Sequence, residues 1–105
     1  MALKDRRMQL DTILREIAEA HSGKVYYQPP SNVQMTYPAI RYRVNRIDAD
    51  YADNVPFLLG TQYEITVIDK NPDSVIAEEI AKLPSCSSNR FYTAENLNHW
   101  VFTIY

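Results

Sequence analysis

The sequence has few of the residues on which small-molecule and metal sites depend. It contains only two glycines, Gly23 and Gly60, and one cysteine, Cys86. A loop that cradles phosphates needs several glycines close together, so nucleotide-binding motifs of that kind are excluded. A single cysteine forms no disulfide within the chain and no cysteine-based zinc site. We therefore expect no cofactor.

Long apolar runs are also missing. No run approaches the roughly 20 residues that a membrane span requires. The first residues, MALKDRRMQL, lack the apolar stretch of a secretory signal. We expect a chain that stays in the cytoplasm in which it is made and has no membrane partner.

An excess of basic charge is the third absence. Lys and Arg number 11 against 13 Asp and Glu, which gives a formal net charge of −2. Dedicated nucleic-acid binders need a broad basic face, and this balance argues against one while leaving room for a local patch. The apolar fraction of 46% is typical of globular proteins. At 105 residues the chain suits a single domain, 1–105, with one core.

Apolar residues at helical spacing predict two helices. The first covers about Ala2 to His21, and Gly23 follows as the residue that takes a left-handed conformation after the last turn. The second follows Asn71, whose side chain we expect to cap the helix, with Pro72 in the first turn and Pro84 at the end. The apolar positions are Leu10, Ile13, Leu14, Ile17 and Ala18 in the first helix and Val75, Ile76, Ile80 and Leu83 in the second.

Alternation of apolar and polar residues predicts the strands. They cover 24–28, 39–48, 58–69, 89–95 and 98–105, and a turn near Asn96 joins the last two. Residues 31–37 are predicted as loop. Residues 49–57 contain turn residues and a proline without periodicity, which predicts a long hairpin loop.

The order of these elements indicates the fold class. Helices at the front and in the middle of a mostly antiparallel set of strands pack most economically on one face of a single sheet. We predict an α+β fold of order α-β-β-β-α-β-β, with one mostly antiparallel sheet of about five strands and two helices packed on one face. Trp100, Phe102 and Ile104 are expected to meet the helices. The opposite face is expected to carry Arg41, Arg43, His99, Val101, Thr103 and Tyr105.

Three aspartates, Asp48, Asp50 and Asp53, are spaced like the carboxylates of a calcium loop. The EF-hand pattern needs a glycine at its sixth position and a glutamate at its twelfth, where this chain has Asp53 and Leu59. A solvated or partner-facing loop is the preferred interpretation.

The two histidines and the cysteine give no catalytic pattern. His21 and His99 lack metal-ligand spacing, and His21 is better explained as a cation at a helix C-terminus. Nothing near Cys86 marks an activated thiolate, so a small buried cysteine is preferred. We predict that the chain is not an enzyme and holds no metal.

Arg41, Arg43 and Arg46, with Tyr42 among them, form a basic and aromatic stretch. Such a stretch suits a surface for single-stranded nucleic acid. It also suits an exposed strand face that uses arginine for solubility or for cross-strand pairing with Glu64. The negative net charge favours the second interpretation. Tyrosine and arginine are also enriched at protein–protein interfaces.

Three segments carry a resemblance to a known family. They are VYYQPPSNVQMTYPAIRYRVNRIDADYADN, YEITVIDKNPDSVIAEEIAKLP and FYTAENLNHWVFTIY. Together they resemble the tail terminators of long-tailed bacteriophages, which are often labelled tail completion or minor capsid proteins. The resemblance covers nearly the whole chain from Val25 onward and includes no catalytic motif.

The resemblance implies a structural role. Tail terminators of this kind form a six-membered ring that caps the growing tail tube, ends its polymerisation and meets the connector below the head. The implied partners are further copies of the chain, the tail tube protein and the head–tail connector or stopper, with DNA only passing through the lumen. The implied location is the neck of the virion, after assembly in the host cytoplasm.

A head-to-tail ring needs two different patches on each subunit. We predict one patch from the basic strand face and the following hairpin, and a second from the segment before the first long strand, for docking to tube or connector. The first comprises Arg41, Arg43, Asp48, Asp50, Tyr51, Asp53 and Phe57, and the second Pro29, Pro30, Met35 and Tyr37.

Two alternatives stay open at this point. One is a connector or stopper protein at the same junction. The other is a small nucleic-acid-binding module that uses Arg41, Arg43 and Arg46 and whose binding depends strongly on salt.

Overall fold

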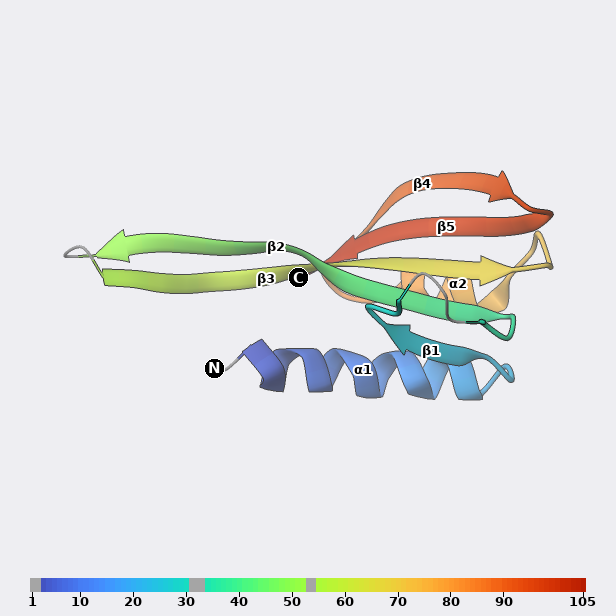
Figure 1. The fold of residues 1–105 in the computed structure, drawn as a ribbon, viewed down its shortest axis with the longest axis horizontal. Helices are drawn as coiled ribbons and strands as arrows, with labels where there is room; N and C mark the ends of the chain where they lie inside the picture. The colour runs from blue at the N-terminus through green and yellow to red at the C-terminus, as the bar shows by residue number, and fades with distance from the viewer. Residues whose placement is uncertain (1–2, 31–33, 53–54) are drawn as a thin grey trace.

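The computed structural model of the chain describes residues 3–30, 34–52 and 55–105. It is an α+β fold with the predicted order of elements (Figure 1). The elements are α1 (Leu3–Glu19), β1 (Lys24–Tyr27), β2 (Ala39–Ala52), β3 (Val55–Asp69), α2 (Val75–Ala81), β4 (Cys86–Ala94) and β5 (Leu97–Ile104).

The five strands form one sheet in the order β1-β2-β3-β5-β4. β1 pairs with β2 in parallel, and the other neighbouring strands are antiparallel. Residues of both helices and of alternate strand positions form a single buried cluster, so both helices pack on the same face. Figure 1 views the sheet from its other face, with α2 behind the strands and α1 beside β1. The predicted fold class is confirmed.

The core combines aromatic residues of the strands with aliphatic residues of the helices. Tyr42 and Tyr63 are its largest fully buried side chains. Phe102 and Ile104 belong to the same cluster and Trp100 packs against it, so the predicted orientation of the last strand is confirmed. The buried cluster contains Leu10, Leu14, Ala18, Ile40, Tyr42, Tyr63, Ile65, Val67, Ile76, Ala77, Ile80, Phe102 and Ile104.

The chain leaves α1 differently from the prediction at Gly23. Ser22 has the left-handed backbone, with φ of 59°, and Gly23 has no positive φ. A Cβ at position 23 would lie 3.1 Å from Cδ1 of Ile76 and 3.2 Å from the Pro38 carbonyl oxygen. A side chain at position 23 would therefore enter a tight site between α1, α2 and the start of β2, whereas the backbone conformation there does not call for glycine.

α2 begins later than its predicted cap. Ser74 is the N-cap, and its Oγ accepts a hydrogen bond from the Ala77 N–H at 3.3 Å. The side chain of Asn71 instead accepts from the Asp73 N–H at 2.9 Å, forming a local turn that competes with helix formation. The prediction of Asn71 as cap is wrong, whereas the helix and its end before Pro84 are confirmed.

The prediction of a long hairpin loop at 49–57 is wrong. β2 continues to Ala52 and β3 begins at Val55. Backbone hydrogen bonds hold a strand pair together, and the turn-like composition of this segment does not prevent them. Pro56 is compatible with the pairing because proline is tolerated on edge strands, and the outer part of β3 has β2 as its only neighbour among the described strands.

The outer parts of β2 and β3, residues 47–52 and 55–61, form a two-stranded ribbon that projects from the rest of the sheet (Figure 1). β5 pairs with β3 from Tyr63 onward, and β1 pairs with β2 only as far as Tyr42. Within the described strands, the two strands of the ribbon therefore pair only with each other.

β4 and β5 form the second hairpin. Glu95 and Asn96 at its turn have φ of 53° and 64°, the positive values that a tight hairpin turn requires. The predicted turn near Asn96 is confirmed. β4 begins at Cys86, earlier than predicted, and its register shifts between Ser88 and Arg90.

Candidate interaction surface

The sheet face opposite the helices carries arginines from two distant strands. Arg41 lies opposite Thr66, Thr66 opposite Val101, and Val101 opposite Arg90 in successive strand pairs. Residues directly opposite one another in a sheet have neighbouring side chains on one face. Arg41 of β2 and Arg90 of β4 therefore share this face, although they are far apart in the sequence.

A bulge in β2 brings Arg46 to the same face. In a regular strand Arg43 and Arg46 would point to opposite sides, because the side-chain period is two. The register shifts before Arg46, so that Arg43 pairs with Glu64 and Arg46 with Gln62. Arg46 Nη2 donates a hydrogen bond to the hydroxyl of Tyr105. We call Arg41, Arg43, Arg46 and Arg90 the arginine face.

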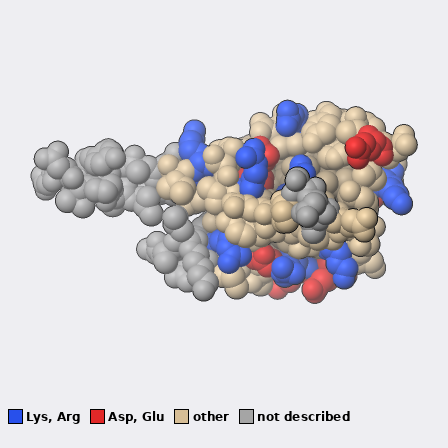
Figure 2. Space-filling view, viewed as in Figure 1, with Lys and Arg blue, Asp and Glu red and all other residues tan. Residues whose placement is uncertain are grey.

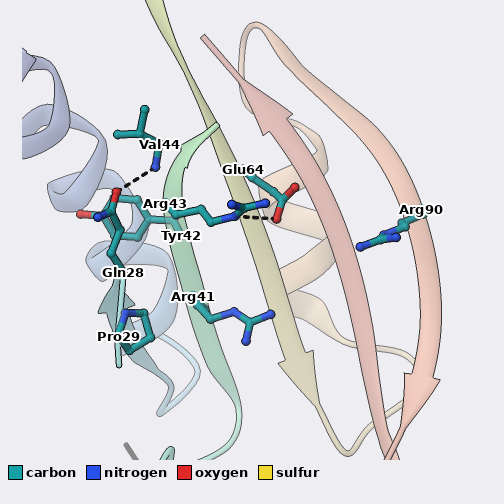
Figure 3. Close-up of a pocket in the computed structure, with 8 residues that line it drawn as sticks. All are labelled: Gln28, Pro29, Arg41, Tyr42, Arg43, Val44, Glu64 and Arg90. Carbon is teal, nitrogen blue, oxygen red and sulfur yellow. Dashed lines mark hydrogen bonds and ion pairs between the residues drawn. The ribbon is translucent and has the colours of Figure 1, made fainter. Parts of the chain in front are cut away.

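The arginine face is hollowed between β2 and β4. The hollow has a volume of about 610 Å³. In Figure 3, Arg41 and Arg43 extend across the sheet from β2, and Arg90 extends toward them from β4. At the β1 side, Gln28 Oε1 accepts a hydrogen bond from the Val44 N–H at 3.2 Å. The hollow is lined by Gln28, Pro29, Arg41, Tyr42, Arg43, Val44, Glu64 and Arg90.

Positive charge exceeds negative charge in this hollow. Arg43 Nε lies 3.2 Å from Glu64 Oε1, in an exposed pair that contributes little stability. Arg41 has no hydrogen-bond or ion-pair partner among the described residues. The guanidinium carbon of Arg90 lies 5.3 Å from the ring centroid of Tyr92. Three guanidinium groups thus face one carboxylate, an arrangement that favours an anionic partner.

The space-filling view also shows how charged side chains are distributed on this face. Figure 2 shows basic side chains spread over the sheet, with an acidic group against a basic one near the middle. The net charge of the whole chain, −2, does not reveal this local excess.

The predicted interface residues fall into four places. Arg41, Arg43 and Pro29 line the hollow. Met35 and Tyr37 line a neighbouring hollow of about 360 Å³ that also includes Arg41. Pro30 is exposed between β1 and β2, while Asp48, Asp50, Tyr51 and Phe57 belong to the ribbon strands and their side chains lie outside the described part of the structure, as does the whole of Asp53.

The contribution of β4 was missed from the sequence, whereas His99 of β5 was predicted on this face. Arg90 lines the hollow, and the rings of Tyr92 and His99 stack with centroids 4.6 Å apart. The register shift between Ser88 and Arg90 changes which positions of β4 point outward, and the pairing of β4 with β5 then puts Arg90 and Tyr92 on this face.

Two residues considered for chemistry lie on the helix side of the sheet. Cys86 is half-buried, and burial raises the pKa of its thiol, which keeps the sulfur protonated at neutral pH. His21 Nε2 lies 3.5 Å from Glu79 Oε1. Among the side chains that the structure describes, no three His, Cys, Asp or Glu are arranged to hold a metal ion. No helix in the described part of the chain is long and apolar enough to cross a membrane.

The fold and this surface define a small α+β protein with a cationic sheet face and a projecting ribbon. No protein-family model matches the sequence, and a search of curated proteins finds no relative. The family resemblance is thus carried by the three sequence segments alone, and the function that it implies is a proposal.

Proposed function

We propose that this chain is a structural protein of the bacteriophage head–tail junction. It caps the tail tube, ends tube polymerisation and joins the tail to the connector as a ring of six copies. The proposal is supported by the resemblance of the three segments and by one structural observation, the projecting ribbon.

The edges of the ribbon favour contact with a partner. An isolated two-stranded hairpin is marginally stable in water, and each of its outer edges presents unpaired N–H and C=O groups. Within the described strands, the pairs from Ile47 with Thr61 to Ala52 with Val55 have no third strand beside them. A neighbouring subunit that packs on the ribbon removes both costs, and a ring supplies such a neighbour to every copy.

A ring also accounts for two dissimilar surfaces on one small chain. Rings close through a heterologous contact, in which one patch of a subunit meets a different patch of the next. The ribbon and the arginine face are two such patches. The hollow lined by Met35 and Tyr37 is then available to the tail tube protein or the connector.

Assembly of the purified chain tests this proposal. Native mass spectrometry over a concentration series, with negative-stain images of the same sample, is expected to show a closed six-membered species. Added to polymerising tail tube protein, the chain is expected to shorten the tubes and to sit at one end of them. Unchanged tubes together with a strictly monomeric chain contradict the proposal. If the chain binds the head–tail connector but has no effect on tail tubes, it belongs to the connector or stopper class.

A nucleic-acid-binding module is the second candidate, because guanidinium groups from β2 and β4 converge on one hollow. It predicts binding of single-stranded oligonucleotides that weakens steeply as salt increases. Replacing Arg41 and Arg43 by alanine would abolish that binding, whereas the ring proposal expects no such affinity. Titration of a fluorescent oligonucleotide at two salt concentrations separates the two.

A further inference from the structure

The ribbon and the hollow of the arginine face have opposite charge. The ribbon strands, 47–52 and 55–61, contain two aspartates, Asp48 and Asp50, and no basic residue. The hollow contains three arginines and one glutamate. Opposite charges steer a ribbon toward a hollow. Like charges disfavour contact of two ribbons or of two hollows.

We infer that the ribbon of one copy docks in the arginine-face hollow of a second copy. This inference rests on the self-association included in the proposed function and adds which two surfaces meet. The contact is heterologous: every copy donates one ribbon and accepts another.

The ribbon does not reach the hollow of its own chain. It continues β2 and β3 outward, away from the part of the sheet that holds Arg41 and Arg43 (Figure 1). To reach that part of the sheet, both paired strands would have to bend back sharply at the base of the ribbon, near Ile47 and Thr61. The contact therefore joins two molecules.

The dimensions of the two surfaces agree. Residues 47–52 extend about 20 Å at ~3.3 Å per strand residue. The hollow runs from β2 across β3 and β5 to β4, which is about 14 Å at ~4.8 Å per strand spacing. One ribbon is long enough to cross the hollow from edge to edge.

Two arginines of the hollow, Arg41 and Arg90, are available to a carboxylate. Among the side chains that the structure describes, neither Arg41 nor Arg90 has an ion-pair partner, and Arg90 lies over the ring of Tyr92. The Glu64 carboxylate is already neutralised by Arg43. An incoming aspartate thus meets Arg41 and Arg90 without displacing an existing ion pair.

Two full-length variants with reversed charge test the contact. The ribbon variant is D48K/D50K, and the face variant is R41E/R90E. A matched control, K70E/K82E, makes the same change of net charge as the face variant at exposed lysines outside the hollow. Circular dichroism and thermal unfolding establish that each variant folds before its association is measured.

Amide chemical shifts locate the contact even when it is weak. The ribbon variant is labelled with ¹⁵N, and unlabelled wild-type chain is added to about 1 mM, where a contact with Kd near 1 mM is still substantially populated. Shifts are expected at Arg41, Thr66, Val101 and Arg90, because wild-type ribbons enter labelled hollows. Unlabelled ribbon variant is expected to produce none. The absence of shifts with wild-type chain overturns the inference, and so do equal shifts with both partners.

Mixing supplies the second test. Each charge-reversed variant alone is expected to associate roughly tenfold or more weakly than wild type, because like charges then oppose each other. A mixture of the two is expected to recover association, since lysine ribbons meet glutamate faces and aspartate ribbons meet arginine faces. The control K70E/K82E is expected to behave as wild type.

The outcomes separate this inference from the proposed function. Variants that form closed rings as readily as wild type overturn the ribbon-to-face contact and leave the proposed function standing. A wild-type chain that shows the shifts but has no effect on tail tubes supports the contact and contradicts the proposed function. Shifts at Arg41 and Arg90 with an oligonucleotide, and none with wild-type chain, replace the inference by nucleic-acid binding.

Discussion

The hydroxyl of Tyr42 donates a hydrogen bond to Oδ2 of Asp11, which ties the centre of the sheet to α1. Both residues are buried, and the other carboxylate oxygen of Asp11 accepts from Nε of Arg15. Burial raises the pKa of Tyr42, and the bond to Asp11 raises it further, so the phenol stays a donor at neutral pH. This polar contact holds α1 against the core on one side of the sheet. The arginine face lies on the other side.

Removing the phenol hydroxyl is expected to destabilise the fold. Tyr42→Phe deletes a hydrogen bond to a charged, buried acceptor, a change that costs about 1.5 to 3 kcal/mol of unfolding free energy. Urea denaturation followed by circular dichroism measures it. Tyr37→Phe is the matched control and is expected to change stability by less than about 0.5 kcal/mol. An equal loss of unfolding free energy in both variants would show that the Tyr42–Asp11 hydrogen bond contributes no particular stability.

The same contact predicts how stability depends on pH. Burial alone would raise the pKa of Asp11, but the hydrogen bonds from Tyr42 and Arg15 and the positive charge of Arg15 outweigh it and lower the pKa below its ordinary value. The unfolded chain therefore binds the proton more readily than the folded chain does. The contribution of Asp11 is complete above its unfolded pKa and is lost as pH falls through the lower folded pKa.

An Asp11→Asn variant lacks this titration. The difference in unfolding free energy between wild type and variant is expected to be constant near neutral pH and to shrink toward strongly acidic pH. Denaturation curves at a series of pH values below 6 measure it. A difference that grows as the pH falls would reverse the assigned sign.

Gly23→Ala is expected to destabilise the protein by about 1 to 3 kcal/mol, the range for overpacking a tight site. The added Cβ would lie 3.1 Å from Ile76 Cδ1 and 3.2 Å from the Pro38 oxygen. Ser22→Gly is the counterpart and is expected to stabilise by about 0.5 to 1 kcal/mol, since Ser22 has φ of 59°. Thermal unfolding of both variants compares packing with backbone strain at adjacent positions, and a stabilising Gly23→Ala would refute the packing argument.

The true cap of α2 is distinguished by two alanine variants. Ser74→Ala removes the acceptor for the Ala77 N–H and is expected to cost about 1 kcal/mol. Asn71→Ala removes only a turn bond to Asp73 and is expected to cost less. Chemical denaturation ranks them, and the reverse order would restore Asn71 as the cap.

Local patterns predicted the elements well because they depend on neighbouring residues. The spacing of Leu10, Leu14 and Ala18 places them one above another on a helix, and all three are buried. Alternation placed Trp100, Phe102 and Ile104 on the helix side. One failure was also local in kind: the sequence predicts Asn71 as a cap, but its side chain accepts a hydrogen bond from the Asp73 N–H in a turn.

The candidate surface was predictable only in part. Arg41 and Arg43 follow from alternation in one strand, and the structure places both in the hollow. Arg90 joins them only because β5 lies between β3 and β4, an arrangement that no short window of sequence contains. Arg46 joins the face only because of the bulge in β2.

By itself, then, the sequence determined the order of helices and strands, the side of the last strand that is buried and the acidic character of residues 47–61, all of which follow from spacing and side-chain chemistry along the chain. Tertiary structure decided how far β2 and β3 pair, which arginines share a face and where the hollow lies. These features depend on strand register and on bulges, and both are set by backbone hydrogen bonds between residues distant in the sequence.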